Sequence, residues 1–149
     1  MTDRPIAIVG GRAIYDNAPT TVFVIAFNVA RELLMIQRAR QPGYGLLGLP
    51  GGYQMRGETW QEAGAREVLE ETGCHLLPTS LLLVSIRTDE YWNNLIICRS
   101  STPVKIERRG DNEALAVLFS NQIGVSNDWA HRDLYEAAAS FVAETNRIG

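Results

Sequence analysis

Cysteine is scarce in this sequence, which has only two in 149 residues. Cys74 and Cys98 show neither the spacing of a zinc site nor that of a disulfide framework. Both lie in apolar stretches, and a buried thiol behaves as a small hydrophobic side chain. We therefore expect two buried free thiols, and a disulfide-held or zinc-held fold is excluded.

Long apolar runs and an excess of one charge are also missing. The longest apolar run, residues 22–27, is far shorter than the roughly 20 residues that cross a bilayer, and residues 1–5 lack the regions of a signal peptide. With 14 basic against 17 acidic residues, the net charge of −3 argues against binding of a nucleic-acid duplex by bulk charge. We expect a cytoplasmic protein without membrane association that acts on small anionic molecules.

The size and composition present are those of an ordinary globular domain. The chain is 46% hydrophobic and 21% charged, and its length suffices to bury a sizeable core. We found no internal repeat, low-complexity tract or linker. We predict a single domain over residues 1–149.

A glycine-rich loop followed by a helix organises the rest of the chain. Gly51 and Gly52 provide a backbone that can approach a ligand closely. Thr59, with Glu62 three residues on, has the form of a capping box, and Gly73 fits the left-handed residue that ends a helix. The pattern predicts a loop and then a helix between Thr59 and Gly73.

Three glutamates share one face of this predicted helix. At 100° per residue, Glu67, Glu70 and Glu71 lie within about 100° of one another. One interpretation is a solvated face on which Arg66 bridges Glu62 and Glu70. The other is a site for hard divalent cations, because Mg²⁺ takes oxygen ligands and favours carboxylates together with substrate phosphates. The adjoining glycine loop favours the cation site.

The spacing of these residues resembles a known motif. Gly52, five residues, Glu58, seven residues and then Arg66 to Cys74 match the Nudix box at its fixed positions. A chance match has a probability below about one in 10⁸ per starting point. Cys74 stands where the family usually has a bulky aliphatic residue. The chain is thus identified as a member of the Nudix hydrolase family by a box from Gly52 to Cys74.

The resemblance implies an α/β fold, a Nudix-type α/β/α sandwich with a mixed β-sheet between the box helix and a C-terminal helix. It implies Mg²⁺-dependent hydrolysis of a pyrophosphate linkage in a nucleoside diphosphate derivative, with Mn²⁺ as a substitute. The implied metal shell consists of the Gly52 carbonyl, Glu67, Glu70 and Glu71. Arg66 and Glu58 are expected to orient that shell rather than to react.

The general base is left open between two glutamates. Glu67 is one candidate, within the box. Glu113 is the other, because residues 113–119 resemble a late Nudix strand that begins with an acidic residue and ends in an aromatic one. In some family members that acid adds a metal ligand or serves as the base. Asp111 is the second choice for this role.

Hydrophobic periodicity predicts the other elements. Residues 21–29 are apolar on both faces, which is typical of a central strand covered on both sides. We expect this strand to form a hairpin with residues 33–38. Residues 133–146 have the spacing of an amphipathic packing helix. Further strands are predicted at 6–9, 12–15, 81–87, 92–99 and 104–107.

Candidate substrate contacts come from two segments. In the loop before the box, Arg38 and Arg40 could meet phosphates and Tyr44 could stack on a base, although such a loop is often only a connector. Tyr91 lies 17 residues beyond the box, about where Nudix hydrolases of dinucleoside polyphosphates often carry a tyrosine, but hairpin ends commonly carry aromatic residues. His131 is interpreted as structural.

The substrate remains open at this stage. The segment 129–132 loosely resembles ADP-ribose-type members, so ADP-ribose or a nucleotide sugar is favoured. A dinucleoside polyphosphate or a nucleoside triphosphate is the alternative. A non-catalytic nucleotide-binding regulator is the alternative class, and a homodimer is left open.

Overall fold

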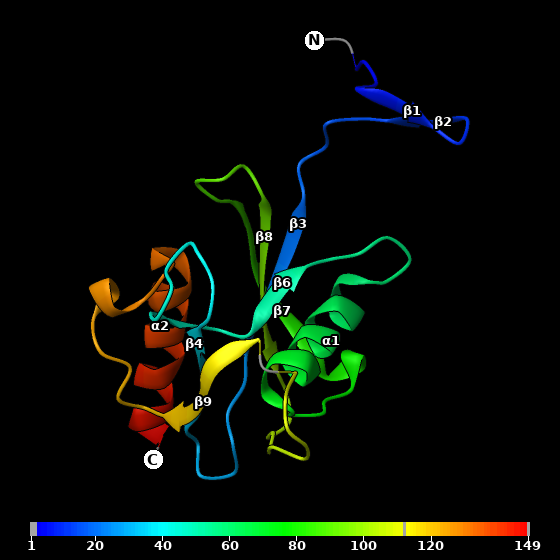
Figure 1. Cartoon of the computed structure of the whole chain (residues 1–149). Helices are drawn as coiled ribbons and strands as arrows, with labels where there is room; N and C mark the ends of the chain where they lie inside the picture. The colour runs from blue at the N-terminus through cyan, green and yellow to red at the C-terminus, as the bar shows by residue number, and fades with distance from the viewer. Residues whose placement is uncertain (1–2, 112, 149) are drawn as a thin grey trace.

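The computed structural model describes residues 3–111 and 113–148. The strands are β1 (Ala7–Val9), β2 (Arg12–Ile14), β3 (Thr20–Ile25), β4 (Leu33–Arg38), β5 (Leu47–Gly48), β6 (Gly51–Tyr53), β7 (Leu81–Thr88), β8 (Asn94–Ser100) and β9 (Ala114–Ser120). The helices are α1 (Trp60–Thr72) and α2 (Arg132–Ile148), with short 3₁₀ turns at Pro78–Ser80 and Ser126–Asp128. The two α-helices lie on opposite sides of the central strands (Figure 1).

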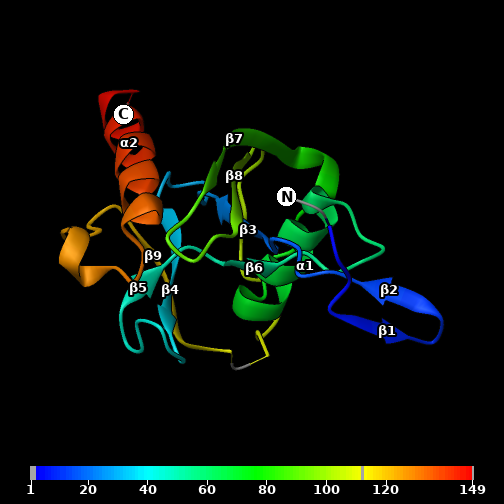
Figure 2. The same ribbon diagram turned by 90° about the horizontal axis from the view of Figure 1, so that it is seen from above.

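A mixed four-stranded sheet in the order β6-β3-β8-β7 forms the centre. β3 runs parallel to β8 and antiparallel to β6. Val22 and Val24 belong to a buried cluster with the apolar residues of α1, whereas Ile25 belongs to a second cluster with those of α2. β3 is therefore covered on both faces, which confirms the predicted sandwich; Figure 2 shows the layers from above.

The predicted hairpin between residues 21–29 and 33–38 forms its turn, where the Asn28 N–H donates to the Glu32 carbonyl, but its strand pairing is wrong beyond that turn. β4 lies in a separate antiparallel sheet, in the order β5-β4-β9, and only the bridge Phe27–Leu33 and the bond from Leu34 N–H to the Ala26 carbonyl link the two segments there. The reason is that both edges of β3 are already occupied, by β6 and β8. β4 must therefore find another partner, which is β9.

The strand predicted at residues 104–107 is also wrong. In this segment Ile106 forms a single bridge with Cys74, while the N–H groups of Glu107 and Arg108 both donate to the Gly73 carbonyl. The backbone thus closes over the C-terminal end of α1 instead of joining a sheet.

α1 begins and ends as predicted. Thr59 and Glu62 form a reciprocal capping box, and Gly73 adopts φ 76° at the C-cap. The Glu62 carboxylate accepts the Thr59 N–H and so serves the cap. Of the bridges in the alternative interpretation of a solvated face, the one from Arg66 to Glu70 is present. At Gly64 an added Cβ would lie 3.0 Å from Leu81 Cδ1 and 3.2 Å from Val22 Cγ1. Glycine here lets α1 pack closely on the sheet.

The helix α2 and the β1–β2 hairpin differ in how they pack against the rest of the protein. α2 packs Leu134, Ala138 and Val142 into the core, as its spacing predicted. The β1–β2 hairpin extends away from the body (Figures 1 and 2) and leaves Ile8 and Val9 64% exposed. Within the described residues, neither helix has the length and apolarity needed to span a bilayer.

Candidate functional site

A cleft of about 860 Å³ opens over one face of the four-stranded sheet. Its lining comes from three of that sheet's strands, the end of β4, α1, the β7–β8 turn and the start of α2. The floor residues are Pro19, Thr21, Phe23, Gly51, Tyr53, Asn93 and Leu95. The cleft therefore brings together segments from most of the chain.

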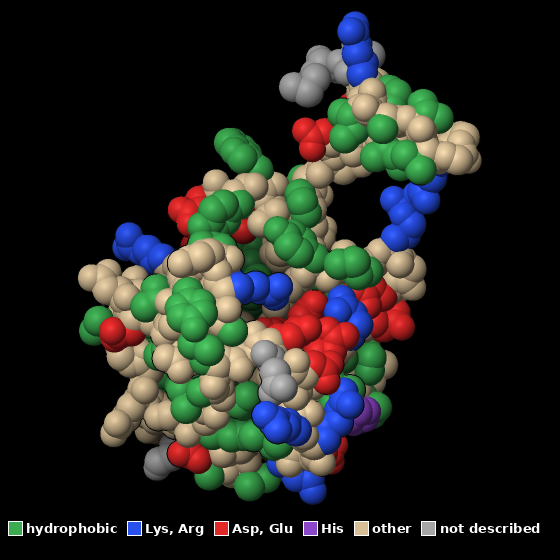
Figure 3. Space-filling model, viewed as in Figure 1, with side chains coloured by type: hydrophobic (Ala, Val, Ile, Leu, Met, Phe, Trp, Pro, Cys, Tyr) green, Lys and Arg blue, Asp and Glu red, His purple; other side chains and the backbone are tan. Residues whose placement is uncertain are grey.

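Three carboxylates meet at one end of this cleft. One oxygen each from Glu67, Glu70 and Glu113 lies within 4.8 Å of the other two. Glu67 and Glu70 project from α1, and Glu113 directly precedes β9. Figure 3 shows acidic side chains gathered over the position of α1, with basic side chains beside them. Like charges this close repel one another unless something neutralises them.

The donor set fits a hard divalent cation. All three groups offer oxygen, which Mg²⁺ and Mn²⁺ accept, and no sulfur or imidazole belongs to the group. Gly52 lies directly against it, because an added Cβ would stand 2.7 Å from Glu67 Oε1. Only glycine lets the backbone of β6 come so close to this carboxylate. The geometry thus suits a cation held by side-chain and backbone oxygen.

Glu71 is placed differently from the other box acids. It lies outside the group of three, is only 4% exposed, and its Oε1 accepts the Gly51 N–H at 2.7 Å. Burial raises the pKa of Glu71 to about 8, and the Gly51 hydrogen bond opposes that shift. Glu71 thereby fastens the glycine strand β6 to α1.

Arg66 connects the acids to the loop. Its guanidinium binds both Glu58 oxygens, at 2.7 and 3.0 Å. It also donates to Glu67 at 3.1 Å, to Glu70 at 3.3 Å and to the Tyr53 carbonyl at 3.1 Å. Hydrogen bonding from Arg66 lowers the pKa of Glu58, while burial raises that of Glu67 against the opposing effect of Arg66. These contacts place Arg66 and Glu58 where they orient the acids.

Two arginines at and just after the end of β4, Arg38 and Arg40, also line the cleft. Arg38 follows an irregularity in the β4–β9 pairing and donates from Nε to the Pro42 carbonyl at 2.8 Å. Burial, and then the neighbouring Arg40, lower the pKa of Arg38. Both side chains line the cleft, whereas Tyr44 is 57% exposed and lies outside its lining. The loop thus brings two of its three predicted contacts to the site.

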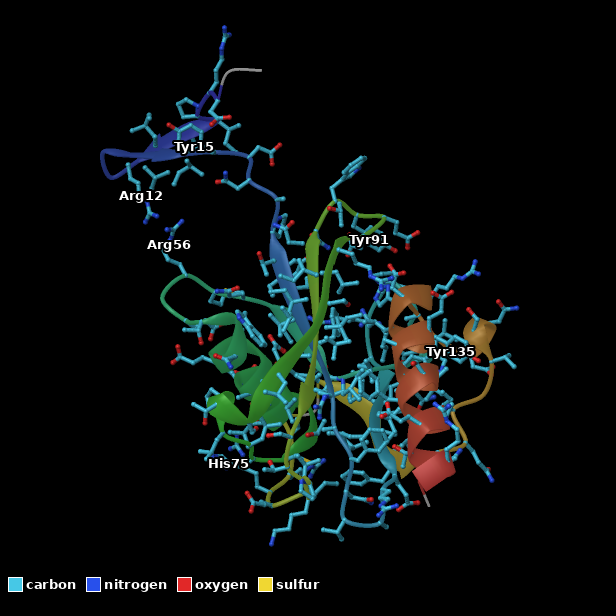
Figure 4. The ribbon with its side chains drawn as sticks, turned by 180° about the vertical axis from the view of Figure 1, so that it is seen from behind. Arg12, Tyr15, Arg56, His75, Tyr91 and Tyr135 are labelled. Atoms are coloured by element: carbon cyan, nitrogen blue, oxygen red, sulfur yellow. The ribbon has the colours of Figure 1, made fainter. Side chains whose placement is uncertain are left out.

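Aromatic side chains form the other end of the cleft. Tyr91 stands at the β7–β8 turn beside the start of α2 (Figure 4). Its ring meets His131 edge-on, with centroids 6.2 Å apart, and His131 also lies 6.4 Å from the Phe23 ring. Burial, and then Arg38, lower the pKa of His131. A planar group could be held between such rings.

Sequence reasoning missed several cleft residues. His131 was interpreted as structural, and Thr21, Phe23 and Asn93 were not predicted as substrate contacts, yet each lines the cleft. The alternation of Pro19, Thr21 and Phe23 along a strand places them on one face. The alternation could be seen in the sequence, but the sequence did not show which face of the strand would line an open cleft.

Comparison with known proteins agrees with the motif. The model of the NUDIX domain matches residues 18–123. The 8-oxo-dGDP phosphatase NUDT18 of Mus musculus is 35% identical over 129 residues, covering 84% of this chain and 40% of the mouse protein. An ADP-ribose pyrophosphatase of Methanocaldococcus jannaschii is 42% identical over 55 residues, covering 37% of this chain and 31% of that protein. The chain thus spans well under half the length of these relatives.

The fold agrees as well. A NUDIX hydrolase from Nitrosomonas europaea superposes with a TM-score of 0.69 at 23% identity, covering 91% of this chain and 76% of that chain. At this identity the likeness supports the fold alone. The domain match over most of its length shows that the chain belongs to the Nudix family.

Proposed function

We propose that this chain is a divalent-cation-dependent pyrophosphohydrolase that cleaves a phosphorus anhydride in a nucleoside diphosphate derivative. The observation that carries the proposal is the arrangement of one cleft. Three carboxylates stand at one end, two arginines beside them, and aromatic side chains at the other end. A diphosphate needs cations, and a base needs a flat apolar surface.

The residues that would hold the cation are Glu67, Glu70 and Glu113, with the Gly52 carbonyl beside them. When bound, Mg²⁺ neutralises phosphate charge and lowers the pKa of a water molecule. Glu71 stays among the proposed ligands, and in the described structure its carboxyl holds β6 in place. Arg66 and Glu58 fix the directions of the Glu67 and Glu70 oxygens.

The chain's own groups also move the proton. Either Glu67 or Glu113 takes it from water on a carboxylate oxygen. Burial raises the pKa of Glu67, which favours it as a proton acceptor, while its Oε1 accepts a hydrogen bond from Arg66. Glu113 lies on the segment that leads into β9. Both glutamates stay candidates for the base.

Arg38 and Arg40 would bind the phosphates. Both line the cleft, and the bond from Arg38 to the Pro42 carbonyl holds its guanidinium in place. Tyr91 would cover the base, with His131 behind it. Tyr44, proposed for the same role from the sequence, lies outside the cleft lining, so Tyr91 takes precedence in the proposal.

Two substrates deserve the first trials. The relative that covers 84% of the chain is named an 8-oxo-dGDP phosphatase, which supports an oxidised purine nucleoside diphosphate. ADP-ribose, favoured from the sequence, is supported by the shorter match to an ADP-ribose pyrophosphatase. Both carry the nucleoside diphosphate that the cleft would hold. We place 8-oxo-dGDP first.

A substrate panel tests the function. Catalytic efficiency is compared for 8-oxo-dGDP, ADP-ribose, a nucleotide sugar, diadenosine polyphosphates and nucleoside triphosphates, with Mg²⁺, Mn²⁺ or a chelator, and both phosphate products are identified. We expect cation-dependent cleavage, with 8-oxo-dGDP ahead by tenfold or more, about 1.4 kcal/mol of transition-state binding. Binding without hydrolysis of any compound would instead indicate a nucleotide-binding regulator.

We also propose a homodimer. The edge strand β7 exposes Leu83 and Ile86, and the β1–β2 hairpin exposes Ile8 and Val9. Such edges are sites where a second chain can pair. Sedimentation of the whole chain over a range of concentrations tests this, and a monomer at all of them rejects it.

A further inference from the structure

The hydroxyl of Thr21 is a buried polar group with no visible use in the fold. Thr21 is 5% exposed, and its Oγ1 has no hydrogen-bond partner among residues 3–111 and 113–148. Burial of a hydroxyl without a hydrogen bond is unfavourable, and nearly all such groups in proteins have a partner. The side chain lines the cleft. A molecule bound in the cleft could therefore supply the missing partner.

Strand geometry places Thr21 in the middle of the cleft floor. Thr21 is opposite Leu95 on β8 and opposite Tyr53 on β6. Because side chains alternate between faces, Phe23 and Asn93 share its side of the sheet, and all of these residues line the cleft. The hydroxyl thus lies between an aromatic ring and the turn that carries Tyr91.

Asn93 adds a second neutral polar group beside it. Asn93 is 7% exposed, and its Nδ2 donates to Asp89 Oδ2 at 3.2 Å. Asp89 Oδ1 accepts the N–H groups of Tyr91 and Asn93, both at 2.9 Å. With the bond from the Asp89 N–H to the Asn93 backbone carbonyl, they hold the turn rigidly and leave the side-chain Oδ1 of Asn93 to accept a hydrogen bond.

The charges of this end select the kind of group that Thr21 can meet. Asp89, Glu90, Arg132 and Asp133 line the cleft here. Asp133 is paired with Arg87, and Arg132 with Glu136, so the charges of Asp89 and Glu90 disfavour phosphate. Of the two arginines, Arg40 acts on Glu71 at the carboxylate end, whereas Arg38 acts on both Glu71 and His131 and therefore lies between the two ends. A neutral, planar heterocycle with hydrogen-bonding edges fits both the rings and the two neutral polar groups.

We propose that Thr21 is a specificity-determining residue whose hydroxyl hydrogen-bonds the edge of the nucleotide base, with Asn93 as the neighbouring polar contact. The base lies against Tyr91 and His131, and the diphosphate lies toward the carboxylates. This inference rests on the proposed function for the location of the diphosphate. The inference adds to that function the residue that recognises the base, Thr21.

Ser85 provides a matched control. Its Oγ is the other buried side-chain atom without a hydrogen-bond partner in the described part of the chain. Ser85 lies on β7 and is not among the residues that line the cleft. Removal of either hydroxyl relieves the same kind of unfavourable burial, but only Thr21 can touch a ligand.

The experiment compares Thr21→Val, Thr21→Ser and Ser85→Ala on the best nucleotide of the panel and on ribose 5-diphosphate, which has no base. For Thr21→Val we expect a rise in KM of roughly 5- to 20-fold on the nucleotide and no change on ribose 5-diphosphate. Thr21→Ser and Ser85→Ala should keep wild-type values. Equal losses of Thr21→Val on both compounds, or no loss on either, would overturn the proposal.

Calorimetry separates this inference from the proposed function. Binding of the corresponding nucleoside monophosphate is measured in chelator, where hydrolysis plays no part. Weaker binding by Thr21→Val alone supports the base contact even if no substrate is cleaved. Unchanged binding rejects it even if cleavage is fast. Thermal unfolding without ligand should show Thr21→Val to be at least as stable as the wild type, since it removes an unpartnered hydroxyl.

Discussion

The two ends of the cleft are built in opposite ways. At the carboxylate end, Arg66 ties Glu58, Glu67 and Glu70 together by hydrogen bonds within one loop and helix. At the aromatic end, side chains from β3, the β7–β8 turn and the start of α2 meet without such a network, and the Thr21 hydroxyl has no partner among the described residues. The side chains of the first end are already oriented by hydrogen bonds and suit a cation, whereas the second end leaves a polar group for a ligand. We infer that the carboxylate end sets the reaction and the aromatic end sets the substrate.

Removal of charge at the carboxylate end should have the largest effect. For Glu67→Gln and for Glu70→Gln we expect turnover to fall by about 10³-fold, because each loses a ligand of a cation that supplies several kcal/mol of charge stabilisation, with little change in fold. Glu107→Gln, an exposed glutamate off the cleft, is the control. Rates with saturating Mg²⁺ provide the measurement. Near-normal turnover in both variants would remove the carboxylate end from the mechanism.

The raised pKa of Glu71 should make the stability of the metal-free protein, measured in the presence of a chelator, depend on pH. Its folded pKa of about 8 lies above the ordinary value near 4.3. The folded state therefore binds the proton more tightly, and the free energy of unfolding should fall as pH rises from about 4.5 to 8. Glu71→Gln, which needs no proton, should flatten this fall and be more stable above pH 8 by a few kcal/mol. Parallel unfolding curves from pH 5 to 9 for the two proteins would contradict this.

Arg66→Lys should weaken cation binding at the carboxylate end without abolishing it. Lysine keeps a charge but cannot bind both Glu58 oxygens while reaching Glu67 and Glu70. We expect a loss of about 10- to 100-fold in activity, as for other residues that orient metal ligands, and a higher Mg²⁺ concentration at half-maximal rate. Arg87→Lys, whose partner is the half-exposed Asp133, should leave that concentration unchanged. A fall in rate without a change in the Mg²⁺ requirement would point to another role for Arg66.

The smallest expected effect distinguishes two tyrosines. Tyr91 lines the aromatic end, and Tyr44 lies outside the cleft lining. Tyr91→Ala should raise KM by an amount equivalent to about 1 kcal/mol, the lower end for base stacking, with kcat unchanged. Tyr44→Ala should change neither constant. The reverse result would restore the stacking role that the sequence suggested for Tyr44 and weaken the comparison between the two ends.

The sequence was sufficient for the part of the molecule held by short-range interactions. The capping box, the left-handed Gly73 and the shared face of Glu67 and Glu70 all depend on residues a few positions apart. It was also sufficient for β3, because burial on both faces leaves an uninterrupted apolar run. What failed was strand pairing, since periodicity shows which residues are buried but not which edge remains open. The predicted hairpin failed beyond its turn for that reason.

The sequence by itself therefore determined the box helix, its acidic face and the layers around β3. Tertiary structure alone decided that Glu113 joins Glu67 and Glu70, that Glu71 turns to the Gly51 N–H, and that Tyr91 rather than Tyr44 lines the cleft. Each of these outcomes depends on how a distant strand or loop packs against α1 or the sheet. Contacts between distant segments follow from the packing of the whole core, which no local pattern encodes.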